Sequence, residues 1–185
     1  MPPDPKRVLD LGSGAGRLLS LVKAGHPKAQ FVALDFSPAM LDALRRTFGR
    51  EGNVSIVSHD LAAPLPSMGS FDCVVSSFAI HHVTHERKRR LYEEIFEVLA
   101  SGGVFCNLEH VASPTEVLHR QFLSALQVAP EDEDPSNKLL DVETQLKWLS
   151  EIGFVDVDCH WKWRELALLT GVKPSDGIGK RSNAY

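Results

Sequence analysis

Three glycines at alternate positions follow a short apolar run near the start of the chain. The run RVLDL covers residues 7–11, and Gly12, Gly14 and Gly16 come directly after it. A buried strand that turns at glycines into a helix brings bare backbone close to a nucleotide-like ligand. Asp10, two residues before the first glycine, adds a negative charge. That charge disfavours a pyrophosphate and suits a ligand with an ammonium or sulfonium group.

The spacing of the glycines separates two classes of nucleotide ligand. A dinucleotide fingerprint, G-x-G-x-x-G, would require a third glycine where this chain has Arg17. The observed pattern is D-x-G-x-G-x-G. Together with the acid, it indicates S-adenosylmethionine (SAM) as the ligand. A nicotinamide-dependent oxidoreductase is a further alternative, which Arg17 disfavours.

Two more acids fall where expected strands end. Asp35 lies 19 residues beyond Gly16, a separation at which an acid commonly accepts both hydroxyls of a ribose. Phe36 could lie against an adenine ring, Asp60 could accept from its amino group, and the backbone of Leu61 could donate to the ring. Alternatively, each acid caps the turn that follows it, and Phe36 belongs to the core.

Four residues are candidates for the substrate side of the site. His81 and His82 follow the apolar run at 71–77, and Glu109 and His110 lie at the end of the next one. We expect all four to face the same crevice as the cofactor. His82 or His110 could act as a base, since imidazole titrates near neutral pH, while His81 and Glu109 could contact the substrate. Alternatively, the histidine pair packs at the start of the next helix.

Short apolar runs alternate with helical patterns along the chain. Strands are expected at 7–11, 30–35, 54–59, 71–77, 103–109, 154–161 and 165–170, and helices at 17–23, 38–48, 84–99, 115–127 and 141–152. Repeated βα units imply an α/β, doubly wound, mostly parallel sheet with helices on both faces. The last two strands are too close together for a helix between them and should form an antiparallel hairpin.

The chain is expected to form a single domain over residues 1–174. The stretch 62–70 is too short and too broken by prolines for a full helix. Residues 112–140 are more than a simple connection needs and are predicted to be a substrate cap, or alternatively a surface excursion. Residues 175–185 form a polar tail.

Composition limits the partners. The formal charge of −4 and the isoelectric point near 6.0 argue against nucleic-acid binding. We expect the basic run at 87–90 to be solvated helix surface. Trp161 and Trp163, on the final hairpin, belong to the core or to a homodimer surface, or alternatively form an aromatic cage for a quaternary amine. The expected partner is a small-molecule methyl acceptor.

The cysteines and the hydropathy of the chain indicate in which cellular compartment it is found. The three cysteines are far apart and include no C-x-x-C pair, so we expect buried thiols and no metal site. No apolar run reaches the length of a membrane span. These features predict a cytoplasmic protein.

Several segments of the chain resemble those of one known family, and they occur in the same order along the chain. They are VLDLGSGAGRLL, FVALDFSPAMLDALR, SIVSHDLAAPLP, FDCVVSSFAIHHV and LYEEIFEVLASGGVFCNLEHV, with the ending GFVDVDCHWKW and ELALLTGVK. The chain is identified as a member of the class I (Rossmann-like) SAM-dependent methyltransferases. This resemblance implies strand order 3-2-1-4-5-7-6 with strand 7 antiparallel. It also implies that backbone near Gly12, Ser76 and Ser77 holds the methionine part of SAM.

One departure from the family concerns the start of the chain. Family members usually carry a helical segment before the first strand that folds over the cofactor, and only six residues precede Arg7 here. We expect either a shortened chain or another element that closes the site.

The expected activity is in-line methyl transfer from SAM to an oxygen or nitrogen nucleophile, which leaves S-adenosylhomocysteine (SAH). A general base is needed only when the nucleophile carries a proton that must leave early. Two alternatives stay open. One is a protein that binds SAM or SAH without turnover, and the other is an enzyme that uses a SAM derivative.

Overall fold

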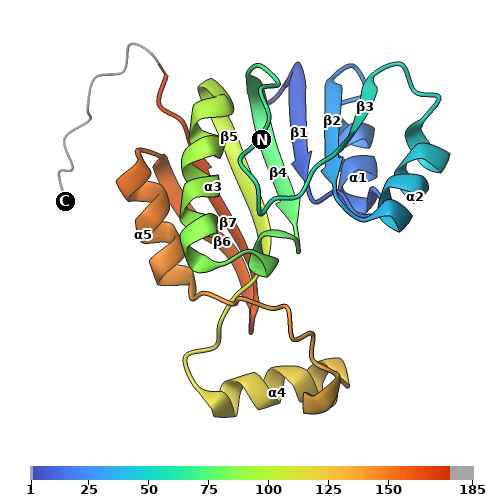
Figure 1. Cartoon of the computed structure of the whole chain (residues 1–185). Helices are drawn as coiled ribbons and strands as arrows, with labels where there is room; N and C mark the ends of the chain where they lie inside the picture. Colours follow the sequence, from blue (N-terminus) through green and yellow to red (C-terminus); the bar gives the residue numbers. More distant parts are fainter. Residues whose placement is uncertain (1, 176–185) are drawn as a thin grey trace.

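The computed structural model describes residues 2–175, which form one seven-stranded sheet with the order β3-β2-β1-β4-β5-β7-β6 (Figure 1). Strands β1 to β5 pair in parallel, and β7 runs antiparallel to both of its neighbours. The predicted fold class and strand order are confirmed. The strands are β1 (Arg7–Leu11), β2 (Gln30–Asp35), β3 (Val54–Ser58), β4 (Phe71–Ser77), β5 (Leu99–His110), β6 (Val155–Trp163) and β7 (Leu166–Val172).

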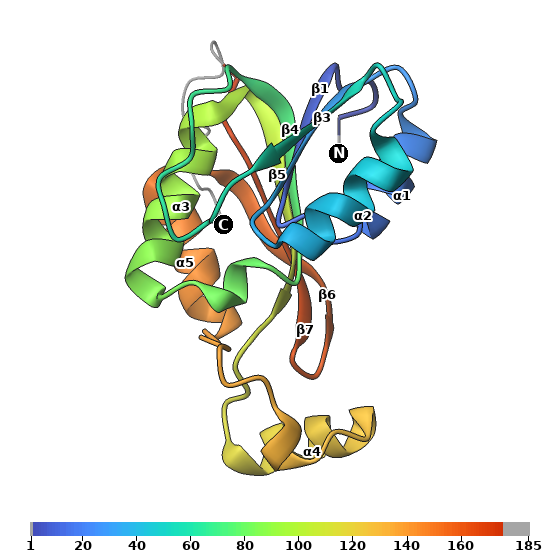
Figure 2. The same cartoon turned by 45° about the vertical axis from the view of Figure 1, so that its right-hand side comes forward.

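Helices cover both faces of the sheet, as predicted. Figure 2 shows α1 and α2 on one face and α3 and α5 on the other. The helices are α1 (Arg17–Gly25), α2 (Pro38–Phe48), α3 (His85–Val98), α4 (Glu116–Leu126) and α5 (Val142–Ile152), with short 3₁₀ turns η1 (Ile80–His82) and η2 (Pro130–Asp132). Between β3 and β4, residues 62–70 form no helix, which confirms that prediction.

The junction between α3 and β5 differs from the prediction. The helix was expected to reach Leu99 and to stop at the Ser-Gly-Gly turn. Instead it ends at Val98, and β5 begins at once with Leu99, which pairs with Phe71 of β4. Tertiary pairing with the neighbouring strand therefore decides this boundary, and Gly102, with φ +77°, lies inside the longer strand.

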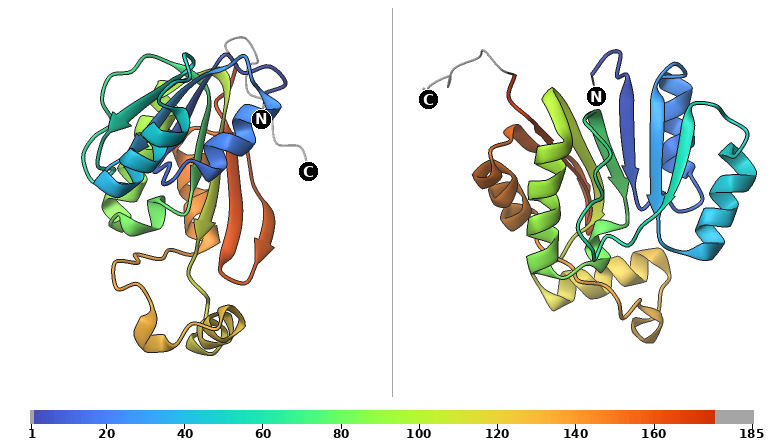
Figure 3. Two further views of the ribbon diagram at one scale, coloured as in Figure 1. Left: turned by 90° about the vertical axis from the view of Figure 1, so that its right-hand side faces the viewer. Right: turned by 45° about the horizontal axis from the view of Figure 1, so that its top comes forward.

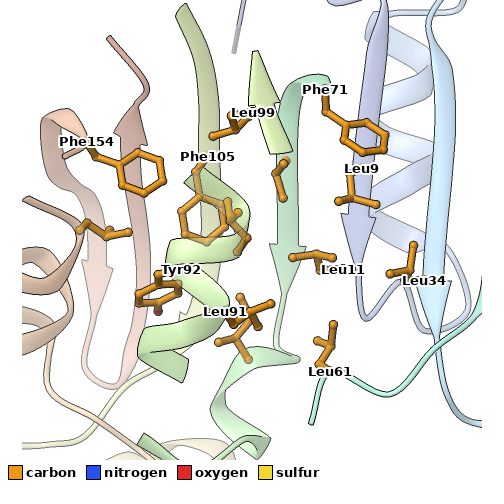
Figure 4. Packing of buried hydrophobic residues seen from close by; sticks show 14 of the residues in the cluster. Leu9, Leu11, Leu34, Leu61, Phe71, Leu91, Tyr92, Leu99, Phe105 and Phe154 are labelled. Atoms are coloured by element: carbon orange, nitrogen blue, oxygen red, sulfur yellow. The ribbon is translucent and has the colours of Figure 1, made fainter. Parts of the chain in front are cut away.

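Each face of the parallel strands is buried, because successive side chains point to opposite faces. Val8 packs with Leu19 of α1 and Leu44 of α2 on one side. On the other side, Leu9 belongs to the cluster shown in Figure 4, which includes Tyr92 of α3. These two layers fix the carboxyl ends of the strands, where the candidate site lies.

Residues 112–140, which we call the insertion, connect β5 to α5. Figures 1 and 3 show its helix α4 beyond the edge at which the parallel strands end, apart from the other helices. Two backbone hydrogen bonds hold the insertion. Lys138 N–H donates to His81 O over 2.7 Å and joins the insertion to η1, and Ala112 N–H donates to Leu140 O over 3.1 Å and joins the two ends of the insertion.

Three further predictions concern surfaces and ends. Trp161 and Trp163 are 48% and 41% exposed on β6, so they are not core residues, and their place in a homodimer surface stays a prediction. Of the predicted tail, residues 176–185 lie outside the described part of the chain. Among residues 2–175, no helix is long and apolar enough to cross a bilayer.

Candidate functional site

A cavity of about 1020 Å³ opens at the carboxyl ends of the first four strands. Such a position is where doubly wound sheets bind ligands. Eight of the nine residues predicted to bind the cofactor line it: Asp10, Gly12, Gly14, Asp35, Phe36, Asp60, Leu61 and Ser77. Four segments far apart in the sequence, at the ends of β1, β2, β3 and β4, therefore contribute to one concave surface.

The glycine-rich turn leaves open space at one position and packs tightly at two others. A Cβ on Gly14 would meet no atom within 4 Å, and its φ of +54° is one that L residues rarely adopt. A Cβ on Gly12 would overlap the side chain of Ala79. Gly16 does not line the cavity; a Cβ there would overlap the ring of Phe48 of α2. Gly14 thus offers the backbone face that a ligand can approach.

Asp35 holds the glycine-rich turn against the end of β2. Its Oδ2 accepts from Gly14 N–H over 2.8 Å, and its Oδ1 accepts from Ser37 N–H over 2.9 Å. A carboxylate has about four lone-pair positions, so each oxygen can accept one further bond. The side chain is fixed in place and retains the capacity to accept from the two hydroxyls of a ribose.

Asp10 is buried without a hydrogen-bond partner for its carboxyl group. It is 1% exposed, and neither Oδ atom has a partner among the described residues. Burial raises the pKa of Asp10 to about 7, the charge of Asp35 adds to this rise, and the Ser13 hydroxyl opposes it. Leaving a buried polar group unpaired is costly. A cationic ligand group in the cavity would supply the missing partner.

A second unpaired atom lies on the same cavity. Nε2 of His59 is buried and has no partner among residues 2–175, and His59 lines the cavity together with Asp10. Unpaired buried groups in a native structure call for an explanation, and an absent ligand is one. The negative group, the open glycine and the ribose acceptor together fit an amino-acid nucleoside such as SAM.

The expected adenine end contains one residue with a turn-capping role. Asp60 Oδ1 accepts from Ala62 N–H over 2.9 Å, as its alternative interpretation predicted. The adjacent Leu61 is buried, and its carbonyl accepts from Nε of Arg87 over 2.8 Å. Phe36 is 67% exposed at the cavity, so it is not a core residue and presents a flat apolar face.

The end of β4 places an aromatic side chain that the sequence analysis missed. Ser76 is buried, and its hydroxyl donates to Leu11 O over 2.9 Å, so it joins two strands. Ser77 and Phe78 line the cavity. Phe78 has φ +51° and is 41% exposed. A non-glycine residue with this φ is uncommon and often belongs to a functional site; no sequence signal marks it.

The four candidate substrate residues do not share one crevice. Among them, His82 lines the cavity, and the other three do not. His81 is 5% exposed, and its Nδ1 lies 2.9 Å from Oε1 of Glu109, which is fully buried. Nε2 of His110 lies 3.0 Å from Oε2 of Glu165. The expectation that all four face the cofactor is wrong, because His81 and Glu109 are buried against each other and His110 pairs with Glu165 instead of lining the cavity.

Glu109 is the centre of a buried polar cluster. Its Oε2 accepts from Asn107 Nδ2 over 3.2 Å and lies 4.0 Å from Nζ of Lys88, which is 0% exposed. Burial lowers the pKa of Lys88, and the charge of Glu109 opposes that shift. The prediction that the whole basic run at 87–90 is solvated surface is therefore wrong at Lys88.

A second polar chain joins the insertion to the sheet. Glu165, at the β6–β7 turn, is fully buried, and its Oε1 lies 3.0 Å from Nδ1 of His119 on α4. The other ring nitrogen of His119 lies 3.1 Å from Oε2 of Glu133. His110 thus helps to anchor the insertion through Glu165. Within residues 2–175, no group of three or more His, Cys, Asp or Glu side chains is arranged so that it could hold a metal ion.

The family model described as "Methyltransferase domain" matches residues 8–103. This match covers the glycine-rich turn, Asp35, Asp60 and the first four strands. The chain belongs to the class I SAM-dependent methyltransferases. Membership of this family disfavours the nicotinamide-dependent alternative and identifies SAM as the methyltransferase cofactor.

Curated relatives of this methyltransferase have different activities in their names. A demethylmenaquinone methyltransferase of Clavibacter sepedonicus is 32% identical over 92% of this chain and 74% of its own length. One of the same name from Thermus thermophilus is 38% identical over 60% of this chain and 50% of its own. A carboxy-S-adenosyl-L-methionine synthase of Helicobacter hepaticus is 24% identical over 90% of this chain and 75% of its own.

Solved structures share the fold of this methyltransferase. An O-methyltransferase family protein from Burkholderia thailandensis superposes with a TM-score of 0.75 at 20% identity, covering 92% of this chain and 52% of its own. Human N-acetylserotonin methyltransferase in complex with SAM gives 0.67 at 18% identity, covering 92% and 48%. The chain spans about half the length of these two structures and of the Thermus relative.

Proposed function

We propose that this methyltransferase transfers the methyl group of SAM to an oxygen or nitrogen nucleophile of a small molecule. The unpaired, buried carboxyl group of Asp10 supports cofactor binding most directly. The cavity of about 1020 Å³ extends from this group to His82, and so leaves a region beyond the cofactor residues for an acceptor. The formal charge of −4 favours a small molecule over a nucleic acid.

The residues of the chain bind and align rather than react. Bound SAM supplies an electrophilic methyl group on a sulfonium, and the sulfur leaves as a neutral thioether. Asp10 offsets the positive charge of the amino-acid end, and Asp35 accepts from the ribose. The backbone at Gly14 lets the ligand lie close to the turn. Alignment of nucleophile, methyl carbon and sulfur is what these contacts contribute to the rate.

We assign the insertion to the acceptor side of the cavity. Asp134 and Ser136 of the insertion line the cavity along with Phe78 and His82. The insertion can therefore limit access of water to the acceptor and select its shape. Cytoplasmic location, a homodimer, and the absence of nucleic-acid and membrane partners stay predictions.

One alternative activity has a specific observation in its favour. The Helicobacter relative is named as a synthase of carboxy-SAM and matches 90% of this chain. A protein that acts on a SAM derivative would use the same cofactor residues. A SAM- or SAH-binding protein without turnover is the other alternative.

The proposal is tested by calorimetry and by product analysis. The full chain is titrated with SAH, and is then incubated with SAM carrying a labelled methyl group and a panel of small hydroxyl and amine acceptors. We expect SAH to bind and label to reach a hydroxyl or amine product. Binding without any labelled product would favour the non-catalytic alternative, and absence of SAH binding by folded protein would refute the proposal. Mass spectrometry of ligand retained on purification separates SAM from a derivative.

A further inference from the structure

The loop between β3 and β4 contains the residues expected at the adenine end of the cofactor. Residues 59–70 form neither helix nor strand, so no helical or sheet hydrogen bonds hold them. Asp60 and Leu61 of this loop line the cavity. Ordering irregular backbone costs conformational entropy, which contacts from other elements must offset. The positions of Asp60 and Leu61 therefore depend on what holds the loop.

Arg87 of α3 binds the loop at two main-chain carbonyls. Its Nε donates to Leu61 O over 2.8 Å, and its Nη2 donates to Ala63 O over 2.7 Å. The side chain of Arg87 is 12% exposed, so the prediction that the basic run is solvated surface is wrong at this position too. A guanidinium suits this role, because its planar fork presents several N–H donors in fixed directions.

Glu94, about two helical turns after Arg87, orients the guanidinium and also holds the loop directly. Nη1 and Nη2 of Arg87 donate to Oε1 and Oε2 of Glu94, the second over 2.8 Å. Oε2 of Glu94 accepts in addition from Leu65 N–H over 2.9 Å. Burial acts to raise the pKa of Glu94, but the hydrogen bonds from Arg87 and Leu65 outweigh it, and the net pKa is lowered. The pair is therefore ionised and bidentate at neutral pH, which is the strong form of this contact.

One peptide unit of the loop is hydrogen-bonded on both sides. The carbonyl of Leu61 accepts from Arg87, and the amide of Ala62, in the same peptide unit, donates to Oδ1 of Asp60 over 2.9 Å. Since a peptide unit is planar and rigid, Arg87 acts on the Asp60 carboxylate through it. Within residues 2–175, no hydrogen bond uses Oδ2 of Asp60 or the amide of Leu61. Both groups are left for a ligand.

We propose that Arg87 and Glu94 are positioning residues that align the Asp60 carboxylate and the Leu61 amide for selective recognition of adenine. The inference rests on the proposed function and deepens it by assigning base selectivity to contacts made from α3. Adenine presents an amino donor beside a ring nitrogen that accepts, and a carboxylate beside an N–H is the complementary pair. Neither Arg87 nor Glu94 lines the cavity, so both act through the loop and not on the ligand itself.

A ligand with hypoxanthine in place of adenine separates this role from general stability. Hypoxanthine has a carbonyl oxygen in place of the amino group and a ring N–H in place of the accepting nitrogen. The oxygen would face the Asp60 carboxylate, and the ring N–H would face the Leu61 amide, whereas the ribose and the amino-acid end are unchanged. The ratio of the affinities for SAH and S-inosylhomocysteine therefore measures how well the two loop groups are aligned.

Calorimetry on the full chain measures this ratio. We expect the wild type to bind SAH at least about tenfold more tightly than S-inosylhomocysteine, the usual effect of hydrogen bonds to a charged group. Arg87→Gln cannot span the Leu61 and Ala63 carbonyls and Glu94, and it should lower the ratio by about threefold or more, because misaligned hydrogen bonds weaken steeply. Arg87→Lys, which keeps the charge but offers a single nitrogen, should give an intermediate ratio, and it replaces Arg87→Gln if that variant does not fold.

Two control variants on α3 account for lost charge and lost stability. Arg90→Met removes an exposed ion pair with Glu86. Ile95→Val removes a buried methyl group next to Glu94 and should lower the free energy of unfolding. Both should keep the wild-type ratio. A drop in Ile95→Val as large as that in Arg87→Gln would attribute the effect to stability and overturn the proposal.

The outcomes for the wild type distinguish this inference from the proposed function. If folded wild-type protein does not bind SAH, the proposed function fails and the inference fails with it. If SAH binds but the wild type has equal affinity for S-inosylhomocysteine, or if Arg87→Gln keeps the wild-type ratio, the proposed function stands and the positioning role is refuted.

Discussion

The main-chain amide of Gly14 donates a hydrogen bond to Oδ2 of Asp35 over 2.8 Å. This bond joins the turn after β1 to the end of β2, and it fixes the carboxylate beside the one glycine of the turn whose Cβ position is open. The same two residues were predicted separately from the sequence, one for close approach and one for a ribose. Their direct contact means that a change at either one affects both.

Gly14→Val is expected to abolish SAH binding, because the added side chain would occupy the open space above the turn. The φ of +54° adds backbone strain of roughly 1–2 kcal/mol. Calorimetry with SAH measures the loss, and urea unfolding measures the strain. Gly102→Ala, at φ +77° and away from the cavity, is the control for backbone strain, although its Cβ would also lie 3.0 Å from Oγ of Ser175. Unchanged SAH affinity in Gly14→Val would contradict the proposed contact.

Asp35→Ala is expected to weaken SAM binding by roughly 1.5–3 kcal/mol, the usual contribution of hydrogen bonds to a charged group. The change removes both the ribose acceptor and the acceptor of Gly14 N–H. Asp42→Ala, an exposed acid on α2 that pairs with Arg45, is the matched control. Equal affinities in the two variants, measured by calorimetry, would show that Asp35 does not contact the ligand.

The affinity for SAM should rise with pH up to about pH 7. Burial raises the pKa of Asp10 to about 7, so at lower pH the carboxyl group must lose a proton before it can pair with a cation. Below this pKa the affinity should fall progressively, approaching tenfold per pH unit. Asp10→Asn should bind SAM more weakly and without this dependence. A wild-type affinity that is constant from pH 5.5 to 7.5 would contradict the assignment.

The same group predicts the sign of a stability change in the free protein. The pKa of Asp10 is raised in the folded state from 3.8 to about 7, so the folded protein retains this proton to higher pH than the unfolded chain. The contribution of Asp10 to the free energy of unfolding is therefore present below pH 3.8 and is lost as pH rises to about 7. Urea unfolding of the wild type and of Asp10→Asn, compared at each pH, measures this contribution of Asp10 to the free energy of unfolding.

Lys88→Met is expected to lower the free energy of unfolding by roughly 3–5 kcal/mol, because it leaves the buried charge of Glu109 without its cationic partner. The double variant Lys88→Met/Glu109→Gln should recover much of this loss. Urea denaturation provides the measurement. Arg90→Met, in the same basic run but exposed, should change the free energy by less than about 1 kcal/mol. A similar small change in Lys88→Met would argue that Lys88 does not neutralise Glu109.

Local patterns in the sequence predicted the cofactor half of the site. The glycine-rich turn follows β1 directly, Asp35 is the last residue of β2, and Asp60 lies two residues after β3. Parallel strands end at one edge of the sheet. Strand order followed from the family resemblance. Gly16 was grouped with the other glycines because spacing alone does not distinguish a glycine near a ligand from one packed against a helix, here the ring of Phe48.

The acceptor half could not be predicted in the same way. His81, His82, Glu109 and His110 were expected to face one crevice, yet Glu109 pairs with His81 and His110 pairs with Glu165. Neighbouring residues in a strand or a 3₁₀ turn point in different directions, so proximity in the sequence does not give a shared surface. Lys88 could not be predicted either. Its run of basic neighbours indicates a solvated helix surface, whereas the structure buries Lys88.

The sequence by itself determined the alternation of strands and helices, the ligand class and the turn expected to bind that ligand, because these depend on residue types at short spacings; the strand order came from the family resemblance. Only the tertiary structure decided that Ser136, 54 positions from His82, lies 2.9 Å from its Nδ1. It likewise decided which face of each element is buried. Such contacts depend on how distant segments pack. Burying apolar surface stabilises whichever residues come into contact, and those residues can lie at any separation along the chain.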